Sequence, residues 1–139
     1  MTPCTELSKP PPLVAVVDDD AAVCNSLKFA LELEGFSVRT FGSGAELLGA
    51  DDIGTCDCFV VDEKMPGMSG LEVIAEIRDR HISAPAILII SQPNTRVSAR
   101  AAKSHVPIVE KPLLGNALVE RIREACSRNG AEGAPKYRP

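Results

Sequence analysis

The chain has 139 residues, about the length of one domain, and 45% of them are hydrophobic, so a sizeable buried core is expected and a second folded domain is not. The formal net charge of −4 argues against a general nucleic-acid-binding surface. No apolar stretch approaches the roughly 20 residues that cross a bilayer, and the N-terminus lacks the pattern of a signal peptide. We therefore expect a cytoplasmic protein whose partners are proteins or metal-held anions.

The first half of the chain predicts three strands and two helices. Residues 1–12 end in a run of three prolines and are expected to form a leader, because proline fits neither a helix interior nor a central strand. Gly35 is placed to close the first helix, and Ser43 to cap the second. The predicted elements are strands at 13–17, 37–41 and 58–61 and helices at 22–34 and 43–48.

The second half continues the alternation. Ser69 is placed to cap a helix whose apolar stripe contains Leu71, Ile74 and Ile77, and a further stripe from residue 114 to residue 125 predicts a last helix. The remaining predicted elements are strands at 86–90 and 106–109 and a weakly amphipathic helix at 94–103. The domain is expected to span residues 13–127, with a flexible tail at 128–139 that is rich in Gly, Pro and charge.

Five strands alternating with five helices predict an α/β fold, a doubly wound parallel sheet with helices on both faces. The strand segments at 13–17, 58–61 and 86–90 are rich in Val and Ile and do not alternate with polar residues. This pattern is typical of strands that are buried on both faces. The mixed polarity of residues 37–41 instead favours an edge strand.

Polar residues follow four of the predicted strands. Because ligands of open parallel sheets bind outside the carboxyl ends of the strands, these residues are expected to form one site. Carboxylates together with phosphate oxygens are the usual ligands of Mg²⁺, and a carboxylate can also attack phosphorus to give an acyl phosphate. The site is therefore suited to holding a divalent cation beside a phosphoryl group. Its residues are Asp18, Asp19, Asp62, Ser91 and Lys111.

Four segments together resemble the receiver domain of two-component response regulators. They are Val16-Val17-Asp18-Asp19-Asp20, the stretch from Val60 to Gly70, Ile90-Ser91 and Glu110-Lys111-Pro112. The resemblance covers residues 13–127 and is greatest to receivers of the nitrogen-fixation regulator subfamily, which usually carry a DNA-binding domain that is not expected in this chain. It implies a flavodoxin-like sheet with strand order 2-1-3-4-5. It also implies a phosphorylation switch, with at most self-phosphorylation and self-dephosphorylation, in place of a turnover enzyme.

The resemblance gives each site residue a role. Asp62 would be the phosphoacceptor, supplied by a histidine kinase or a phosphotransfer protein. Lys111 would pair with the phosphoryl oxygens, and Ser91 would hydrogen-bond one of them. The Lys111–Pro112 peptide bond would be cis. The ligands of Mg²⁺ would be Asp18, Asp19, Asp62 and the backbone carbonyl of Lys64.

The sequence departs from the family in the region that transmits the signal. Ile108 stands where receivers commonly carry Tyr or Phe, and the stretch from 91 to 111 is about two residues shorter than usual. Ile108 is β-branched and has one preferred χ1 rotamer, so it is not expected to switch between two positions as an aromatic ring can. We expect the output, a downstream protein contact, to use Ile108 and the segment from Gln92 to Lys103. The cations on that segment are Arg96, Arg100 and Lys103.

Three other functions fit parts of the sequence. The chain could be a phosphorylation-independent adaptor with a receiver-like fold, or the receiver part of a longer DNA-binding regulator. It could also be a haloacid-dehalogenase-like phosphatase with Asp18 as nucleophile and Asp20 as acid, but Ala22 stands where that family has a small hydroxyl residue. As the last acidic residue before a helix, Asp20 is better interpreted as an N-cap than as a metal ligand.

The cysteines and histidines give no metal-binding pattern. Two cysteines flank residue 57, which would suit a redox or metal pair, but there is no Cys-x-x-Cys motif and no histidine at zinc spacing. We expect His81 and His105 to lie in loops or on the surface. We expect reduced thiols, in the core or on the surface, at Cys4, Cys24, Cys56, Cys58 and Cys126.

Overall fold

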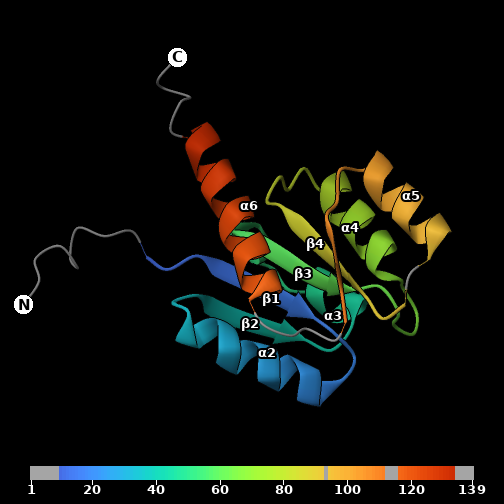
Figure 1. Cartoon of the computed structure of the whole chain (residues 1–139), viewed down its shortest axis with the longest axis horizontal. Coiled ribbons are helices and arrows are strands. Elements are labelled where there is room, and N and C mark those ends of the chain that lie inside the picture. Colours follow the sequence, from blue (N-terminus) through green and yellow to red (C-terminus); the bar gives the residue numbers. More distant parts are fainter. Residues whose placement is uncertain (1–9, 93, 112–115, 134–139) are drawn as a thin grey trace, which may run out of the picture.

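A computed structural model of the chain describes residues 10–92, 94–111 and 116–133. These residues form one five-stranded parallel sheet with the order β2-β1-β3-β4-β5 and helices packed against it, as the sequence predicts (Figure 1). Within the described residues, no helix is long and apolar enough to cross a membrane. The elements are β1 (Leu13–Val17), α2 (Ala21–Leu33), β2 (Ser37–Phe41), α3 (Gly44–Leu48), the 3-10 helix η1 (Ile53–Thr55), β3 (Cys58–Asp62), α4 (Gly70–Asp79), β4 (Ala86–Ile90), α5 (Thr95–Lys103), β5 (Ile108–Glu110) and α6 (Ala117–Gly133).

The burial of the strands follows their position in the sheet. Every residue of β3 and β4 is buried, and so is every residue of β1 except Leu13. β2 contains both buried and half-buried residues and lies at the edge of the sheet. The prediction of central strands covered on both faces and of an edge strand at 37–41 is therefore confirmed.

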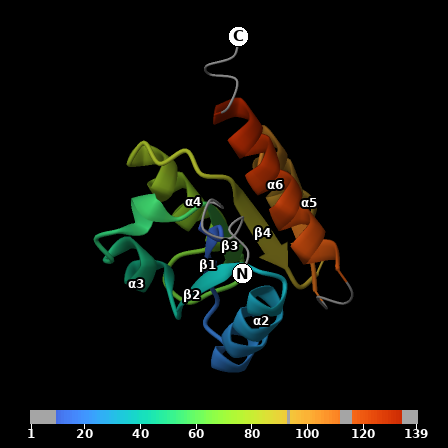
Figure 2. The ribbon, with the colours of Figure 1, turned by 90° about the vertical axis from the view of Figure 1, so that its left-hand side faces the viewer.

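The sheet separates two hydrophobic cores. Alternate residues of the central strands, such as Val61 and Leu88, face a core shared with α3, α4 and α5. Their neighbours, such as Val60 and Ile87, face a second core shared with α2 and α6. Figure 2 shows α3 and α4 on one side of the sheet and α2 and α6 on the other. Because helices cover both faces of the sheet, polar groups can gather only at the ends of the strands.

Side-chain caps begin four of the helices. Asp20, Ser43, Ser69 and Asn94 each accept a hydrogen bond from backbone N–H groups in the first turn of the helix that follows. Ser69 and Glu72 form a reciprocal capping box at the start of α4. The caps at Ser43, Ser69 and Asp20 agree with the sequence analysis, because short polar side chains satisfy helix N–H groups that have no other partner.

Three helices end in the left-handed backbone conformation. Gly35 follows α2 with φ +99°, as expected of a glycine that closes a helix. His81 and His105 follow α4 and α5 with φ +63° and +58°, and both are exposed. Their N–H groups bond to Arg78 and Ala102 carbonyls, which closes the last turn. The histidines are therefore surface residues, as predicted, and they also terminate helices.

The bounds of β5 and the end of α6 differ most from the prediction. The last strand is Ile108–Glu110 and not residues 106–109, because Pro107 has no N–H to donate to the sheet. The Pro107 carbonyl still accepts from Leu88 N at 2.9 Å, so the chain is already aligned there. α6 continues to Gly133, past the predicted domain end at residue 127.

Gly70 offers a test of how tightly the sheet and α4 are joined. A Cβ at Gly70 would lie 2.7 Å from both the Asp62 carbonyl oxygen and Leu88 Cδ1. Gly70→Ala should therefore lower the free energy of unfolding by about 1–3 kcal/mol, as overpacking does. Gly54→Ala is the matched control, since a Cβ there meets nothing within 4 Å. Urea denaturation of both variants measures the difference, and equal midpoints would contradict the close approach.

Candidate functional site

Hydrogen bonds extend the sheet just past the strand ends and hold the polar residues in place. Asp18 N donates to the Phe41 carbonyl at 3.1 Å, and Lys111 N donates to the Ile90 carbonyl at 2.7 Å. Asp62 is the last residue of β3 and is aligned with Ile89 of β4. Asp18, Asp62 and Lys111 are therefore fixed at the same end of the sheet, where the carboxyl ends of the strands meet.

Three carboxylates meet at this carboxyl end of the strands. Asp18, Asp19 and Asp62 each offer an oxygen, and these oxygens all lie within 4.8 Å of one another. Asp18 and Asp62 are only 2% and 4% exposed, whereas Asp19 is exposed. Asp18 Oδ1 also accepts a hydrogen bond from Asp20 N at 2.9 Å. The cluster thus opens to solvent on the side of Asp19.

One ammonium lies beside the two buried carboxylates. Lys111 Nζ is 3.4 Å from Asp18 Oδ2 and 3.3 Å from Asp62 Oδ1. Burial lowers the pKa of Lys111, but the negative charges of Asp62 and Asp18 outweigh it and hold this pKa above its usual value. Lys111 therefore stays charged at neutral pH and links the ends of β1, β3 and β5.

Asp62 differs electrostatically from an ordinary aspartate. Burial and the neighbouring charge of Asp18 raise its pKa from 3.8 to about 6, against the opposing charge of Lys111. Its Oδ1 atom is buried and has no hydrogen-bond partner among the described residues, although it forms the ion pair with Lys111. Buried carboxylate oxygens are normally hydrogen-bonded. Asp62 is thus a buried carboxylate whose Oδ1 atom is held by one ion pair and by no hydrogen bond from the described residues.

The donor set fits a hard divalent cation. Asp18, Asp19 and Asp62 supply clustered carboxylate oxygens, which are the ligands that such a cation prefers. Asp20 does not join the cluster. Its Oδ1 accepts hydrogen bonds from Ala22 N at 2.9 Å and Val23 N at 3.2 Å, at the start of α2. The interpretation of Asp20 as an N-cap is confirmed, and this position does not suit the acid of the phosphatase hypothesis.

A sequence profile of the response regulator receiver domain matches residues 14–123. The chain belongs to the response regulator receiver family. Among curated relatives, the receiver is 33% identical over 121 residues to the transcriptional regulatory protein FixJ of Azorhizobium caulinodans, covering 86% of this chain and 57% of that protein. It is also 32% identical to the transcriptional regulatory protein TdiR of Thauera aromatica, covering 84% of this chain and 52% of that one.

Solved structures agree with this assignment. The crystal structure of FixJ-N is 30% identical and superposes with a TM-score of 0.76, covering 86% of this chain and 96% of that one. A receiver domain protein from Clostridium thermocellum shares the fold, with a TM-score of 0.80 at 24% identity and coverage of 86% and 98%. The receiver thus matches whole receiver domains, but it spans about half the length of the curated relatives.

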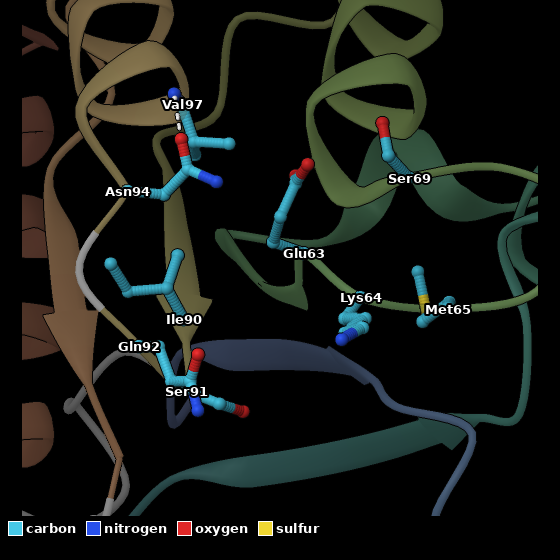
Figure 3. Close-up of a pocket in the computed structure, with 9 residues that line it drawn as sticks. All are labelled: Glu63, Lys64, Met65, Ser69, Ile90, Ser91, Gln92, Asn94 and Val97. Atoms are coloured by element: carbon cyan, nitrogen blue, oxygen red, sulfur yellow. Dashed lines mark hydrogen bonds between the residues drawn. The ribbon is translucent and has the colours of Figure 1, made fainter.

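The receiver carries a groove next to the acidic cluster. It has a volume of about 500 Å³ and lies between the loop after β3 and the segment after β4 (Figure 3). Ser91 and Lys64 are exposed on its two sides. Among the described residues, no hydrogen bond of the Ser91 hydroxyl to Asp62 or Lys111 is present. The roles predicted for Ser91 and for the Lys64 carbonyl remain predictions, and the Lys111–Pro112 bond lies outside the described residues.

Glu63 is a positioning residue that the sequence analysis missed. Its carbonyl accepts from Gly70 N and its Oε1 accepts from Leu71 N, both at 3.0 Å. The loop between Asp62 and α4 is therefore tied at both of its ends. Glu63 follows Asp62 directly, and nothing in the neighbouring sequence distinguishes this role from that of an ordinary surface charge.

The raised pKa of Asp62 predicts a pH-dependent cost in stability. The folded chain binds this proton more tightly than the unfolded chain does, so ionised Asp62 lowers the stability above pH 6 and has no effect once pH falls below 3.8. In metal-free buffer, Asp62→Asn should raise the free energy of unfolding by about 2–3 kcal/mol at pH 7.5 and by about a third of that at pH 4.5.

Exposed Asp51 provides the control for this experiment. Asp51→Asn should change the stability by less than about 0.5 kcal/mol at both pH values. Denaturant unfolding in the presence of a chelator measures both variants. A gain for Asp62→Asn that is the same at pH 4.5 and 7.5 would show that Asp62 is not desolvated.

Proposed function

We propose that this receiver accepts a phosphoryl group on Asp62 from a histidine kinase or a phosphotransfer protein, and that it then acts through contact with another protein. The observation that carries the proposal is Asp62 itself, a buried carboxylate that lies in the acidic cluster beside Lys111 and has a pKa of about 6. Asp62 is ionised at neutral pH, yet it is more basic than a solvated aspartate. Both properties suit a nucleophile.

In the proposed reaction, a carboxylate oxygen of Asp62 bonds to phosphorus while the bond from phosphorus to the donor breaks. Asp18, Asp19, Asp62 and the Lys64 carbonyl would hold Mg²⁺, which supplies neutralising charge for the phosphoryl oxygens. Lys111 lies 3.3 Å from Asp62 and supplies a fixed positive charge at the same place. Ser91 would donate a hydrogen bond to a phosphoryl oxygen. We propose no turnover reaction beyond self-phosphorylation and self-dephosphorylation.

We further propose that the output travels through the segment after β4. Phosphorylation adds a charge of about −1.5 to −2 at Asp62, which attracts Lys111 and Ser91. The segment from Gln92 to Lys103 begins directly after Ser91 and contains α5, which has only one fully buried residue, Ala101. Because α5 is held by so little apolar surface, its displacement costs less than that of the other helices.

One exposed side of α5 carries the charges that a partner would meet. Arg96, Arg100 and Lys103 are all exposed, and their spacing places them along one side of the helix. An acidic or phosphorylated protein is the partner that this surface fits. Ile108 lies half-buried against the core beneath α5, where a branched aliphatic side chain gives support but no polar tip for signalling.

The curated relatives favour a second candidate, in which the receiver is one part of a longer DNA-binding regulator. The relatives are named transcriptional regulatory proteins, and the receiver spans 57% and 52% of two of them. An immunoblot of the native cells distinguishes the candidates. A band of about the size of this chain supports a separate receiver, and a band nearly twice as large supports the longer regulator.

Phosphorylation of Asp62 is tested with acetyl phosphate as the donor. The chain should gain one phosphoryl group in the presence of Mg²⁺ and none in the presence of a chelator. Asp62→Asn should abolish the gain because an amide is not a nucleophile. Intact-protein mass spectrometry measures the product, and Asp51→Asn is the control that should react like the parent. Equal incorporation by Asp62→Asn would disprove the assignment.

The metal ligands are tested by a matched pair of neighbouring variants. Asp19→Asn should weaken Mg²⁺ binding by roughly tenfold or more, because an amide replaces a charged oxygen ligand. Asp20→Asn should leave the affinity nearly unchanged, since asparagine also caps a helix. Titration followed by amide chemical shifts measures both. Equal losses would mean that the cluster of Asp18, Asp19 and Asp62 is not the binding site.

The route of the output is tested with a beryllium fluoride phosphoryl mimic. Amide shifts should change most at the acidic cluster and along residues 92–103, and much less in α2. Ile108→Ala should keep both phosphorylation and this pattern, because the displaced element is the backbone of the segment. Shifts confined to β5, or their loss in Ile108→Ala, would instead indicate a side-chain switch at Ile108.

A further inference from the structure

Two of the described cysteines form a pair, one on strand β3 and the other on helix α6. The described thiols, Cys24, Cys56, Cys58 and Cys126, are all free, which agrees with the expected reduced state. α6 packs against β3, and the side chains of Cys58 on β3 and Cys126 on α6 interact with each other. Cys58 belongs to the core between the sheet and α6, and Cys126 packs against that core. The two sulfur atoms are therefore neighbours although 67 residues separate them in the sequence.

The two members of the pair have different access to solvent. Cys58 is fully buried, whereas Cys126 is half-exposed and lines a groove of about 500 Å³. The groove lies between α6, the residues after α2 and the start of β1, and it also contains Phe36 and Arg123. A small oxidant can thus reach Cys126 from the groove, whereas Cys58 has no exposed surface.

The interaction between the two side chains also distinguishes the thiols chemically. It lowers the pKa of Cys126, because the Cys58 thiol stabilises a thiolate there, and it raises the pKa of Cys58, with burial adding to the rise. A thiolate is the reactive form of cysteine. The accessible thiol is therefore also the one that ionises more readily, and the buried thiol stays protonated behind it.

We propose that Cys126 and Cys58 form a peroxide-sensitive site that closes to a reversible disulfide between α6 and β3. The Cys126 thiolate attacks one oxygen of hydrogen peroxide, the O–O bond breaks, and a sulfenic acid and one water are formed after proton uptake. The Cys58 sulfur then attacks the sulfenic sulfur and loses its proton. The S–S bond forms, the S–O bond breaks and a second water leaves, so that two thiols are oxidised and one peroxide is reduced.

The site is separate from the acidic cluster. Cys58 is the first residue of β3 and Asp62 is the last, so the pair lies at the opposite end of the strand. A disulfide at this position ties α6 to the central part of the sheet without occupying the groove beside Asp62. The proposal does not depend on phosphorylation, and its test measures only the oxidation of the thiols.

The test exposes the reduced full-length chain to hydrogen peroxide, blocks the remaining thiols with N-ethylmaleimide and maps the peptides by mass. A Cys58–Cys126 cross-link that has lost two hydrogens should form at least about tenfold faster than the Cys56 thiol disappears, because Cys56 is buried and unactivated. Dithiothreitol should reverse it. The cross-linked chain should melt roughly 5–10 °C higher than the reduced chain.

The variant Cys126→Ser should lose the cross-link and leave Cys58 unreactive, since serine keeps the size of the half-exposed residue and removes the attacking sulfur. Cys56→Ser is the matched control and should form the cross-link at the parent rate. Three results would overturn the proposal. They are equal reactivity of Cys56 and Cys126, a disulfide from Cys126 to Cys4 or to a second chain, and oxidation of Cys58 that persists in Cys126→Ser.

Discussion

The site depends on one electrostatic constraint, the burial of two carboxylates beside a single ammonium. Asp18 and Asp62 are almost completely removed from water, and a buried charge is stable only with a partner. Lys111 lies within 3.4 Å of both, so one positive charge is shared between two negative ones. Burial and the remaining charge imbalance raise the pKa of Asp62, and one of its oxygens accepts no hydrogen bond from the described residues. The same imbalance makes a divalent cation a favourable addition.

The rest of the fold keeps this arrangement in place. The central strands are buried on both faces, which prevents the charged strand ends from relaxing into solvent. Gly70 lets α4 begin directly against the Asp62 carbonyl, and Glu63 closes the loop between them. The stability given up at the acidic cluster is offset by two continuous apolar cores. This division between a stable sheet and a site where buried charge lowers the stability is common in functional proteins.

Much of this could be predicted because its causes are local. Unbroken Val and Ile runs identify the central strands, and Asp20, Ser43 and Ser69 identify helix starts by their own hydrogen-bonding capacity. The acidic cluster follows from the place of its residues at the carboxyl ends of parallel strands. Other features depend on distant neighbours. The contact of Cys58 with Cys126 joins a strand to a helix far along the chain, and the role of Glu63 depends on where α4 begins. The exposed position of Ser91 likewise reflects the path of the whole segment after β4.

Pro107 has a consequence for association between molecules. By delaying the start of β5 it leaves an edge strand of only three residues, from Ile108 to Glu110. An unpaired edge can template the addition of a strand from another molecule, and the risk grows with its length and flatness. A three-residue edge that ends in an exposed glutamate offers few free backbone groups to a neighbour. The proline thus limits edge-to-edge aggregation on that side of a sheet whose interior strands are almost entirely apolar.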